Sequence, residues 1–526
     1  MLTFLPAGCI ALLAATILCA CSLDEHPTDQ IAEEKAYTTA TSLYQNTVAT
    51  LYNYIGGSED GQGLQGTCRG VYDLQTFGSD EAILPTRGGD WYDGGLWQAM
   101  YKHTWSAGHD LPKNAWLYLY KVIVLSNRSL EKLDEYRHLL TTDEAQAYQA
   151  EVRALRAIYY YYLMDLFGRV PLVLSSETPM QQVRQSNRAD VCRFIYDELT
   201  TALPLLPAEN STQPGDYYGR VTRPVALFVL AKLALNSTVY GCTAIFGSDS
   251  PLKACIGYCN QIETLGYRLA TNFEDNFAVY NETSPENIWT IPMDKNLYRN
   301  QQQNLYRSYH YRHAAAYGFT AENGSCATRS ALDIFGYATD QQDSRFDKSY
   351  YAGIVYDLNG NVVVDRTGQP LAYVPEAADI DLSGSPYVEV AGARMKKYAV
   401  DKNAPKDVKL MDNDIVLFRY ADVLLMRAEA ALADGDATSA QADLDLIRQR
   451  AGMPAIPATL KNILDERLRE LAWEGWRRQD QIRAGHYRSL YTGADAIDES
   501  DGHTSVFPIP ADVMALNTNL QQNPGY

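Results

Sequence analysis

Basic side chains are scarce in this chain of 526 residues. Lys and Arg number 45 against 64 Asp and Glu, so the formal net charge is −19 at pH 7. Nucleic acids and anionic lipid surfaces attract proteins that expose clusters of Lys and Arg, and the sequence contains no basic patch with interleaved aromatic residues. The charge balance argues against either as the main partner, and we expect no nucleic-acid partner.

The sequence also lacks the motifs of common catalytic and cofactor sites. It contains no G-x-S-x-G, no Walker loop, no H-E-x-x-H and no complete EF-hand loop. Residues 357–361 begin like a calcium loop but lack the acidic twelfth-position ligand, so a hairpin is the preferred interpretation. The pair His310-x-x-His313 has no third ligand, which favours surface or hydrogen-bonding roles. We expect no cofactor, no metal and no enzymatic activity.

Long apolar runs are rare, and the one near the start, 7–20, is shorter than the roughly 20 residues of a membrane span. It fits the hydrophobic region of a secretory signal. The run ends in Leu18-Cys19-Ala20-Cys21, which looks like a bacterial lipobox. We predict a signal peptide at 1–20 and lipidation of Cys21, although no Lys or Arg precedes the run. An ordinary signal peptide with a chance cysteine is the alternative.

Cysteines beyond residue 21 are few and scattered, at positions 68, 192, 242, 255, 259 and 326. A large core does not need disulfide staples, so buried free thiols are the preferred interpretation, with a Cys242–Cys255 bridge left open. Cys255-x-x-x-Cys259 has no nearby His and makes a poor zinc site.

Helical periodicity dominates the first half of the chain. Val152, Leu155 and Leu163 lie on one stripe of a helix that we expect to end at Gly168. The run Tyr159–Tyr162 covers both faces, so we expect only some of its rings in the core; Tyr is abundant overall, 38 against 13 Phe, and suits half-wet surfaces. Further helices are predicted at 36–55, 112–137, 188–203, after Pro224 and at 251–265.

Helices return near the C-terminus, where 414–452 is interpreted as helix, Gly-Asp turn and helix, with Asp436 as N-cap. The next helix places apolar residues on one face and charged residues at i, i+3 and i+4 spacing, which we interpret as structural support rather than a site. These charged residues are Glu466, Arg467, Glu470, Glu474 and Arg477.

Between about 267 and 409 the periodicity fades and Asn, Gln, Gly and aromatic residues increase. The alternation leading into Asn359-Gly360 predicts a hairpin with a type I′ turn, and "AGARMKKYAV" predicts a further short strand. We expect loops, small strands and short helices that pack over one side of the helices.

One loop, "PTRGGDWYDGGLWQ" at 85–98, places aromatic side chains between two glycine pairs. A phosphate cradle is excluded because Asp90 and Asp93 repel anions. A sugar presents an apolar face and a rim of hydroxyls, and the loop supplies matching groups: Trp91 and Tyr92 to stack, and Arg87, Asp90 and Asp93 to form hydrogen bonds. Trp97 fits either the site or the core.

A second aromatic segment, "NLYRNQQQNLYRSYHYRH", supplies further candidate ligand-binding residues, namely Asn296, Tyr298, Tyr306, Tyr309 and Tyr311. Tyr309 and Tyr311 alternate with His and Arg as in a half-exposed strand. The alternative is that these rings seal the irregular part of the chain onto the helices.

Several segments together are specific by their order, although each alone is not. They are the lipobox followed by "LDEHPTDQ", then "PTRGGDWYDGG", "RALRAIYYYYLMDLFGRVPLV", "GRVTRPVALFVLAKLAL", "LFRYADVLLMRAEAAL", "IRQRAG", "ERLRELAWEGWRRQDQIRAG" and the terminal "FPIP…NPGY". They resemble the SusD/RagB family of Bacteroidetes outer-membrane lipoproteins along nearly the whole chain. One departure is Gln481, where the family's Arg-x-x-Asp-Leu-x-Arg run has Leu.

The resemblance implies a mainly α fold of stacked tetratricopeptide-like helical hairpins with an irregular, loop-rich half carrying short strands. It implies one domain at 21–526, with a helical scaffold at about 30–266 and 410–485, a ligand-side insertion at 267–409 and an extended tail at 486–526. It also implies a lipid anchor on the extracellular face of the outer membrane, a glycan ligand and a SusC-like TonB-dependent transporter as partner.

Our first hypothesis is therefore a surface glycan-binding lipoprotein that captures its ligand and hands it over without chemistry. A surface glycoside hydrolase that uses Asp90 or Asp93 as an acid is one alternative. A peptide receptor of the same family is another, since Tyr-rich clefts suit both ligands. The sequence does not identify the glycan.

Overall fold

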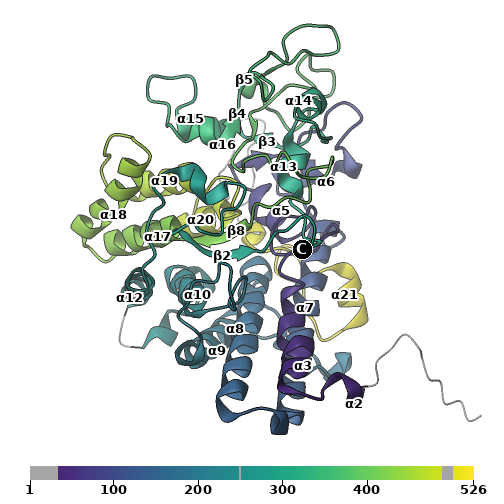
Figure 1. Cartoon of the computed structure of the whole chain (residues 1–526), viewed down its shortest axis with the longest axis vertical. Helices are drawn as coiled ribbons and strands as arrows, with labels where there is room; N and C mark the ends of the chain where they lie inside the picture. Colours follow the sequence, from purple (N-terminus) through teal and green to yellow (C-terminus); the bar gives the residue numbers. More distant parts are fainter. Residues whose placement is uncertain (1–32, 248–249, 488–501) are drawn as a thin grey trace, which may run out of the picture.

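The computed structural model describes residues 33–247, 250–487 and 502–526, and Figure 1 shows two differently built regions. Long helices occupy the lower part of the view and its left side, whereas short strands, short helices and loops occupy the top. One continuous hydrophobic core includes side chains from the predicted scaffold, insertion and tail. The predicted division of the chain into these parts remains a prediction, and the predicted signal peptide and Cys21 lie outside the described residues.

The helices of the first half pair with their neighbours along the chain. α7 packs against α8, α8 against α9, and α10 against α12. Their bounds and those of the shorter helices around them are α2 (Glu33–Ala36), α3 (Ala40–Tyr44), η1 (Gln45–Ala49), α4 (Thr50–Tyr52), α5 (Val71–Thr76), α6 (Leu96–Tyr101), α7 (Asp110–Glu135), α8 (Thr142–Phe167), α9 (Arg188–Ala202), α10 (Arg223–Leu235), α11 (Ser237–Tyr240) and α12 (Pro251–Thr264).

Helix α8 ends at Gly168, as its sequence predicts. Thr141 and Glu144 form a reciprocal capping box at its start, and Gly168, with φ of 68°, ends it. The expectation that only some rings of Tyr159–Tyr162 belong to the core is wrong, because all four are buried. Helices α7, α9 and α10 all contact α8, so two faces of this helix are covered. Buried hydroxyls find partners, as where Tyr160 donates to the Val173 carbonyl (3.0 Å).

The helices of the second half form a second layer around a buried strand pair. β2 (Asn287–Ile291) pairs antiparallel with β8 (Ile415–Arg419), which corrects the prediction that the segment before Tyr420 is helical. All five residues of β8 are buried, and a short apolar run of this kind has the same pattern in a strand and in a helix. The helices that follow are α17 (Tyr420–Ala433), α18 (Ala437–Arg450), α19 (Leu460–Leu471) and α20 (Arg477–Ala484). Asp436 caps α18 as predicted.

The region from 267 to 409 is irregular, as expected. Its short elements and the paired strand β1 are β1 (Ala82–Ile83), α13 (Gln303–Ser308), α14 (Tyr311–Ala316), β3 (Cys326–Ala327), α15 (Arg329–Phe335), α16 (Phe346–Ser349), β4 (Tyr350–Tyr351), β5 (Gly353–Ile354), β6 (Ala372–Tyr373) and β7 (Arg394–Met395). The hairpin at Asn359-Gly360 is present, but its turn is not type I′. Only Gly360 is left-handed (φ 84°), as in a longer loop that closes with a glycine bulge.

Cysteine pairing differs from the prediction. Cys192 on α9 and Cys242 form a disulfide, whereas Cys255 is a buried free thiol, as are Cys68, Cys259 and Cys326. No local pattern in the sequence distinguishes Cys192 from Cys255 as the partner of Cys242.

The charged residues of α19 have the structural role that the sequence predicts, but most of their partners lie outside this helix. Glu466, Glu470 and Arg467 are completely buried and bond across the fold. Arg345, 121 residues away, donates to Glu466 (2.6 Å) and to Glu470 (2.8 Å). These ion pairs join the irregular region to the helices behind it.

The described part of the C-terminal tail, 502–526, is not an extended surface segment. Phe507 and Ile509 are completely buried, and helix α21 (Ala511–Leu516) follows them. Asn523 donates to the carbonyls of Phe167 and Phe507, which ties the end of the chain to α8.

Candidate functional site

The aromatic loop has an unusual backbone. Gly88, Trp91, Asp93, Gly94 and Gly95 all have positive φ, between 44° and 86°. Residues other than glycine adopt this conformation at a cost on the order of 1 kcal/mol or more, so neighbouring contacts must hold it. These tight turns leave residues 88–90 and 92–94 exposed.

Trp91 is half-buried and holds the loop against the protein. Its indole Nε1 donates to the Glu322 carbonyl (3.0 Å), and its ring lies so close to Gly324 that a Cβ there would be 2.8 Å from it. Its neighbour Tyr92 is 53% exposed. The two rings that the sequence treats alike therefore have different environments. Trp97 belongs to the core, since it is buried in contact with Phe77 and Trp91.

The two loop carboxylates are fixed by hydrogen bonds. Asp90 accepts from the Tyr311 hydroxyl (2.9 Å), and Asp93 accepts from Trp97 Nε1 (2.9 Å) and from Arg69 (2.8 Å). Both remain exposed, so each carboxylate retains capacity to accept hydrogen bonds from a ligand.

Charged groups that the sequence did not suggest lie next to this loop. Arg69 also pairs with Asp60 (3.3 Å), and Lys409 lies 4.3 Å from the ring centre of Tyr306. Burial raises the pKa of Asp60, against the opposing charge of Arg69, and burial likewise raises the pKa of Glu322, against Lys409. Half-buried carboxyls beside cations and rings are typical of binding sites.

One local pattern in the sequence could have located some of these charged residues. The segment "GGSEDGQGLQGTCRG", 56–70, contains six glycines, of which Gly61, Gly63 and Gly66 have positive φ. Such a segment is neither helix nor strand, and it brings Asp60 and Arg69 beside the aromatic loop. Glu322 and Lys409 come from distant parts of the chain and have no such signal.

Two of the predicted ligand-binding residues, Arg87 and Tyr309, are buried and contact the protein itself. Arg87 is buried, and its guanidinium donates to the carbonyls of Gly324, Val388 and Ala391. Burial lowers its pKa to about 9. Tyr309 is also buried, and it lies between α13 and α14, so the prediction of a half-exposed strand here is wrong.

The other predicted residues divide between two places. Tyr311 contacts the aromatic loop by its hydrogen bond to Asp90. Tyr306 is connected to the loop through Glu322, whose amide donates to the Tyr306 carbonyl (3.2 Å) and whose carbonyl accepts from Trp91. Asn296 and Tyr298 lie on an exposed segment elsewhere. Tyr298 lines a cavity of about 520 Å³ whose other lining residues do not belong to the loop.

The histidine pair is buried rather than exposed. His310 bonds to Glu389 (3.2 Å), and His313 Nδ1 lies 3.0 Å from the Tyr373 hydroxyl. Within the described ranges no group of three His, Cys, Asp or Glu side chains is placed to hold a metal ion. None of the helices in those ranges combines the length and apolar character that a membrane span needs.

The exposed loop and the charged groups beside it form the candidate site, which we call the platform. It combines an exposed ring, a half-buried ring, fixed carboxylates and two cations, and these groups suit hydrogen bonding and stacking with a polar ligand that has an apolar face.

Comparison with known proteins connects this chain to one family. The SusD family matches residues 274–526, and a second family, described as starch-binding and associating with the outer membrane, matches residues 74–235. The starch-binding protein SusD of Bacteroides thetaiotaomicron is 25% identical over 431 residues, 74% of each chain. SusD-like protein P25 of Formosa agariphila is 26% identical over 396 residues, 71% of this chain and 70% of its own.

Solved structures share the fold. A laminarin-binding SusD-like protein superimposes with a TM-score of 0.71 at 23% identity, covering 93% of this chain and all of the other. Surface glycan-binding protein A of Bacteroides thetaiotaomicron, in complex with laminarihexaose, gives 0.71 at 19% identity, covering 92% of this chain and all of its own. The order of helical hairpins, the irregular region between them and these sequence matches agree: the chain belongs to the SusD family.

Proposed function

We propose that this chain is a non-enzymatic cell-surface lipoprotein that captures an oligo- or polysaccharide and passes it to a SusC-like TonB-dependent transporter. The observation that carries the proposal is Tyr92, a ring 53% exposed on a loop that Trp91, Asp90 and Asp93 hold in place. A fixed, exposed ring stacks on the apolar face of a sugar without a large loss of entropy. Names of relatives that bind starch or laminarin support a glycan as the ligand.

The residues that we assign to the ligand are Tyr92 for stacking, Asp90 and Asp93 for hydrogen bonds to hydroxyls, and Tyr306 and Tyr311 at the edge of the platform. Trp91 contributes its exposed part and the position of the loop. Arg87 and Tyr309 support the loop and its surroundings from within, because they are buried.

Binding to a panel that includes laminarin and starch, measured by calorimetry or affinity electrophoresis, tests the proposal. If stacking removes about 50 Å² of apolar surface from water, it contributes about 1.3 kcal/mol, so Tyr92→Ala should weaken binding about tenfold. Tyr356→Ala, which alters an exposed tyrosine on the hairpin region, is the matched control and should leave the affinity unchanged.

The two alternatives give different results in the same assay. New reducing ends that accumulate when the protein is incubated with a glycan indicate a glycoside hydrolase. Binding to peptides and to no glycan indicates a peptide receptor. Either result refutes capture of a glycan without chemistry.

Anchoring at Cys21 is a separate part of the proposal. Labelling of the expressed protein with a radioactive fatty acid should be abolished by Cys21→Ser, and the variant should leave the membrane fraction. Equal labelling of both proteins would exclude this cysteine as the anchor, whatever the ligand is.

A further inference from the structure

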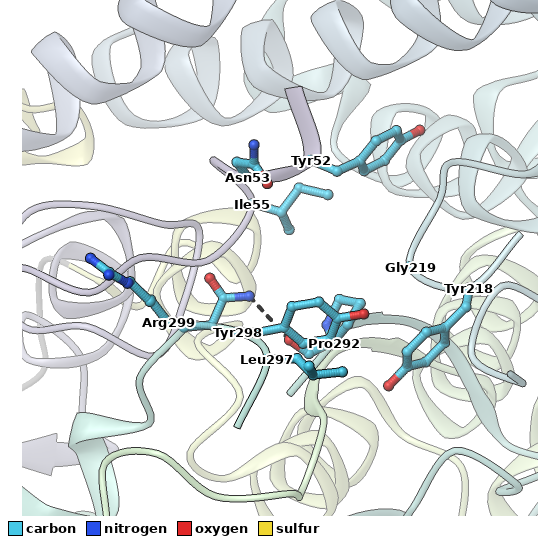
Figure 2. A pocket seen from close by; sticks show the side chains of 10 residues that line it. Tyr52, Asn53, Ile55, Tyr218, Gly219, Pro292, Leu297, Tyr298 and Arg299 are labelled. Atoms are coloured by element: carbon cyan, nitrogen blue, oxygen red, sulfur yellow. Dashed lines mark hydrogen bonds between the residues drawn. The ribbon is translucent and has the colours of Figure 1, made fainter. Parts of the chain in front are cut away.

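A cavity lies between three segments of the chain, and none of its lining residues belongs to the aromatic loop. Figure 2 shows Tyr52, Asn53 and Ile55 on one side of it and Leu297 and Tyr298 on the other. Tyr218 and Gly219 flank the end near Tyr52, and Arg299 lies at the opposite end. Its volume of about 520 Å³ is in the range of small-molecule sites.

The tyrosines of its walls are fixed by their hydroxyls. Tyr218 donates to both oxygens of Asp414 (2.7 and 2.8 Å). Tyr52 donates to Glu151 (2.5 Å) and accepts from the Val221 amide (2.9 Å). With their hydroxyls engaged, the rings offer mainly apolar surface to whatever occupies the cavity.

The backbone of the cavity is also fixed. A Cβ at Gly219 would lie 2.4 Å from the ring of Pro292, and this glycine has φ of 75°, so no other residue fits without rearrangement. Asn300 donates to the Pro292 carbonyl (3.0 Å). The cavity therefore has a defined shape before any ligand binds.

Other side chains of the lining are free to contact a ligand. Leu297 is 74% exposed and Tyr298 is 41% exposed. Among the described residues, the side chains of Arg299 and Asn53 have no hydrogen bond or ion pair, although the protein carries a large excess of carboxylates. Apolar surface beside unpaired hydrogen-bonding groups is the composition of a site for a small polar ligand with an apolar face.

We infer that this cavity is a second carbohydrate site, in which a short stretch of sugar rings packs between Tyr298 and the wall formed by residues 52–55, with Arg299 and Asn53 bonding to hydroxyls. The inference rests on the proposed function, because it assigns to the cavity the same class of ligand as the aromatic loop. Two weak sites on one protein raise the effective concentration of a long chain at each of them. Polysaccharide is then held firmly while each single site still releases its sugars quickly.

Four proteins test this inference: the wild type, Tyr92→Ala, Tyr298→Ala and the double variant. The probes are laminarin and starch with their hexasaccharides, and binding is measured by calorimetry and affinity electrophoresis. Loss of one ring should weaken binding of the recognised polysaccharide about fivefold to tenfold in either single variant. The double variant should show a further loss, to no measurable binding. Tyr356→Ala again serves as the matched control.

A second variant separates loss of a contact from loss of the cavity. Asn53→Trp fills the space from the opposite wall and leaves Tyr298 unchanged, so it should reduce binding as much as Tyr298→Ala does. The inference is refuted if both variants bind like Tyr356→Ala, or if Tyr92→Ala alone removes all binding, and the proposed function then stands with one site. If the wild type binds no glycan at all, the proposed function fails and the inference fails with it.

Discussion

Arg419 is the residue whose loss should be most costly to the fold. This side chain is buried at the end of strand β8 and bonds to Glu286 (2.6 Å), Glu470 (2.5 Å) and Glu474 (2.7 Å). Methionine resembles the arginine stem in length but carries no charge. Arg419→Met therefore leaves three buried carboxylates with fewer partners while it keeps much of the packing.

The size of the effect follows from what those carboxylates retain. Glu470 keeps Arg345 (2.8 Å), and Glu474 keeps Lys397 (2.5 Å). Glu286 keeps Arg450 (3.2 Å), so none of the three is left alone. The cost should therefore be that of breaking one buried pair, about 3–5 kcal/mol. Unfolding entropy is about 2.1 cal/mol/K per residue, or about 1.1 kcal/mol/K for 526 residues. The melting temperature should fall by about 3–5 °C.

The pH dependence gives a second signature. Burial alone raises the pKa of Glu470, but Arg450, Arg419 and Arg345 outweigh it and hold that pKa well below its usual range. A depressed pKa contributes stability above the unfolded value of about 4.3, and that stability is lost as the pH falls. Without Arg419 the carboxyl protonates more readily. The gap between variant and wild type should therefore be nearly constant from pH 7 to pH 5 and should shrink as the pH falls below about 4.

Thermal and urea unfolding at pH 7, pH 5 and about pH 3.5 measure both effects. Arg299→Met is the matched control, because this arginine is exposed and should change stability by less than about 0.5 kcal/mol. If Arg419→Met behaves like this control at pH 7, the buried ion pairs do not stabilise the fold and the reasoning is wrong.

Three further predictions concern other parts of the fold. Burial lowers the pKa of His103 to about 4, below its unfolded value near 6.5, so folding favours the neutral form. The free energy of unfolding should therefore fall by up to about 3 kcal/mol as the pH drops from 6.5 to 4, and His103→Gln should flatten this slope in urea titrations. The Cys192–Cys242 bridge closes a loop of 50 residues, and replacing both cysteines by alanine should cost at most about 4 kcal/mol in the same assay. Gly324→Ala should displace the indole that packs on it, changing tryptophan fluorescence and weakening glycan binding, whereas Gly89→Ala, with open space around it, should do neither.

Local features of the fold could be predicted from the sequence because local chemistry determines them. A capping box and a left-handed glycine mark the ends of α8, and Asp436 marks the start of α18. Strand β8 could not be identified in this way, since its four consecutive apolar residues fit a buried strand and a buried helix equally. Its partner β2 lies more than 120 residues earlier in the chain, so no local pattern joins them.

Long-range contacts account for the other differences. Spacing along α19 suggested pairs within one helix, but an i, i+4 pattern carries no information about a guanidinium such as Arg345 that arrives from another segment. The same limit applies to the site. The aromatic loop was recognisable because glycines and rings are adjacent in the sequence, whereas Glu322 and Lys409 become neighbours of the loop only through folding.

The loop also shows why adjacent aromatic residues can have separate roles. Positive φ at Trp91 turns the chain, so its indole packs on Gly324 while the next ring, Tyr92, faces solvent. Hydrogen bonds offset the strain of that turn: Trp91 donates to the Glu322 carbonyl, and Asp93 accepts from Trp97 and Arg69. A loop held in this way does not have to be ordered when a ligand arrives, so less binding energy is lost to entropy. Trp91 therefore contributes to ligand affinity chiefly by fixing the loop, and Tyr92 contributes by contact.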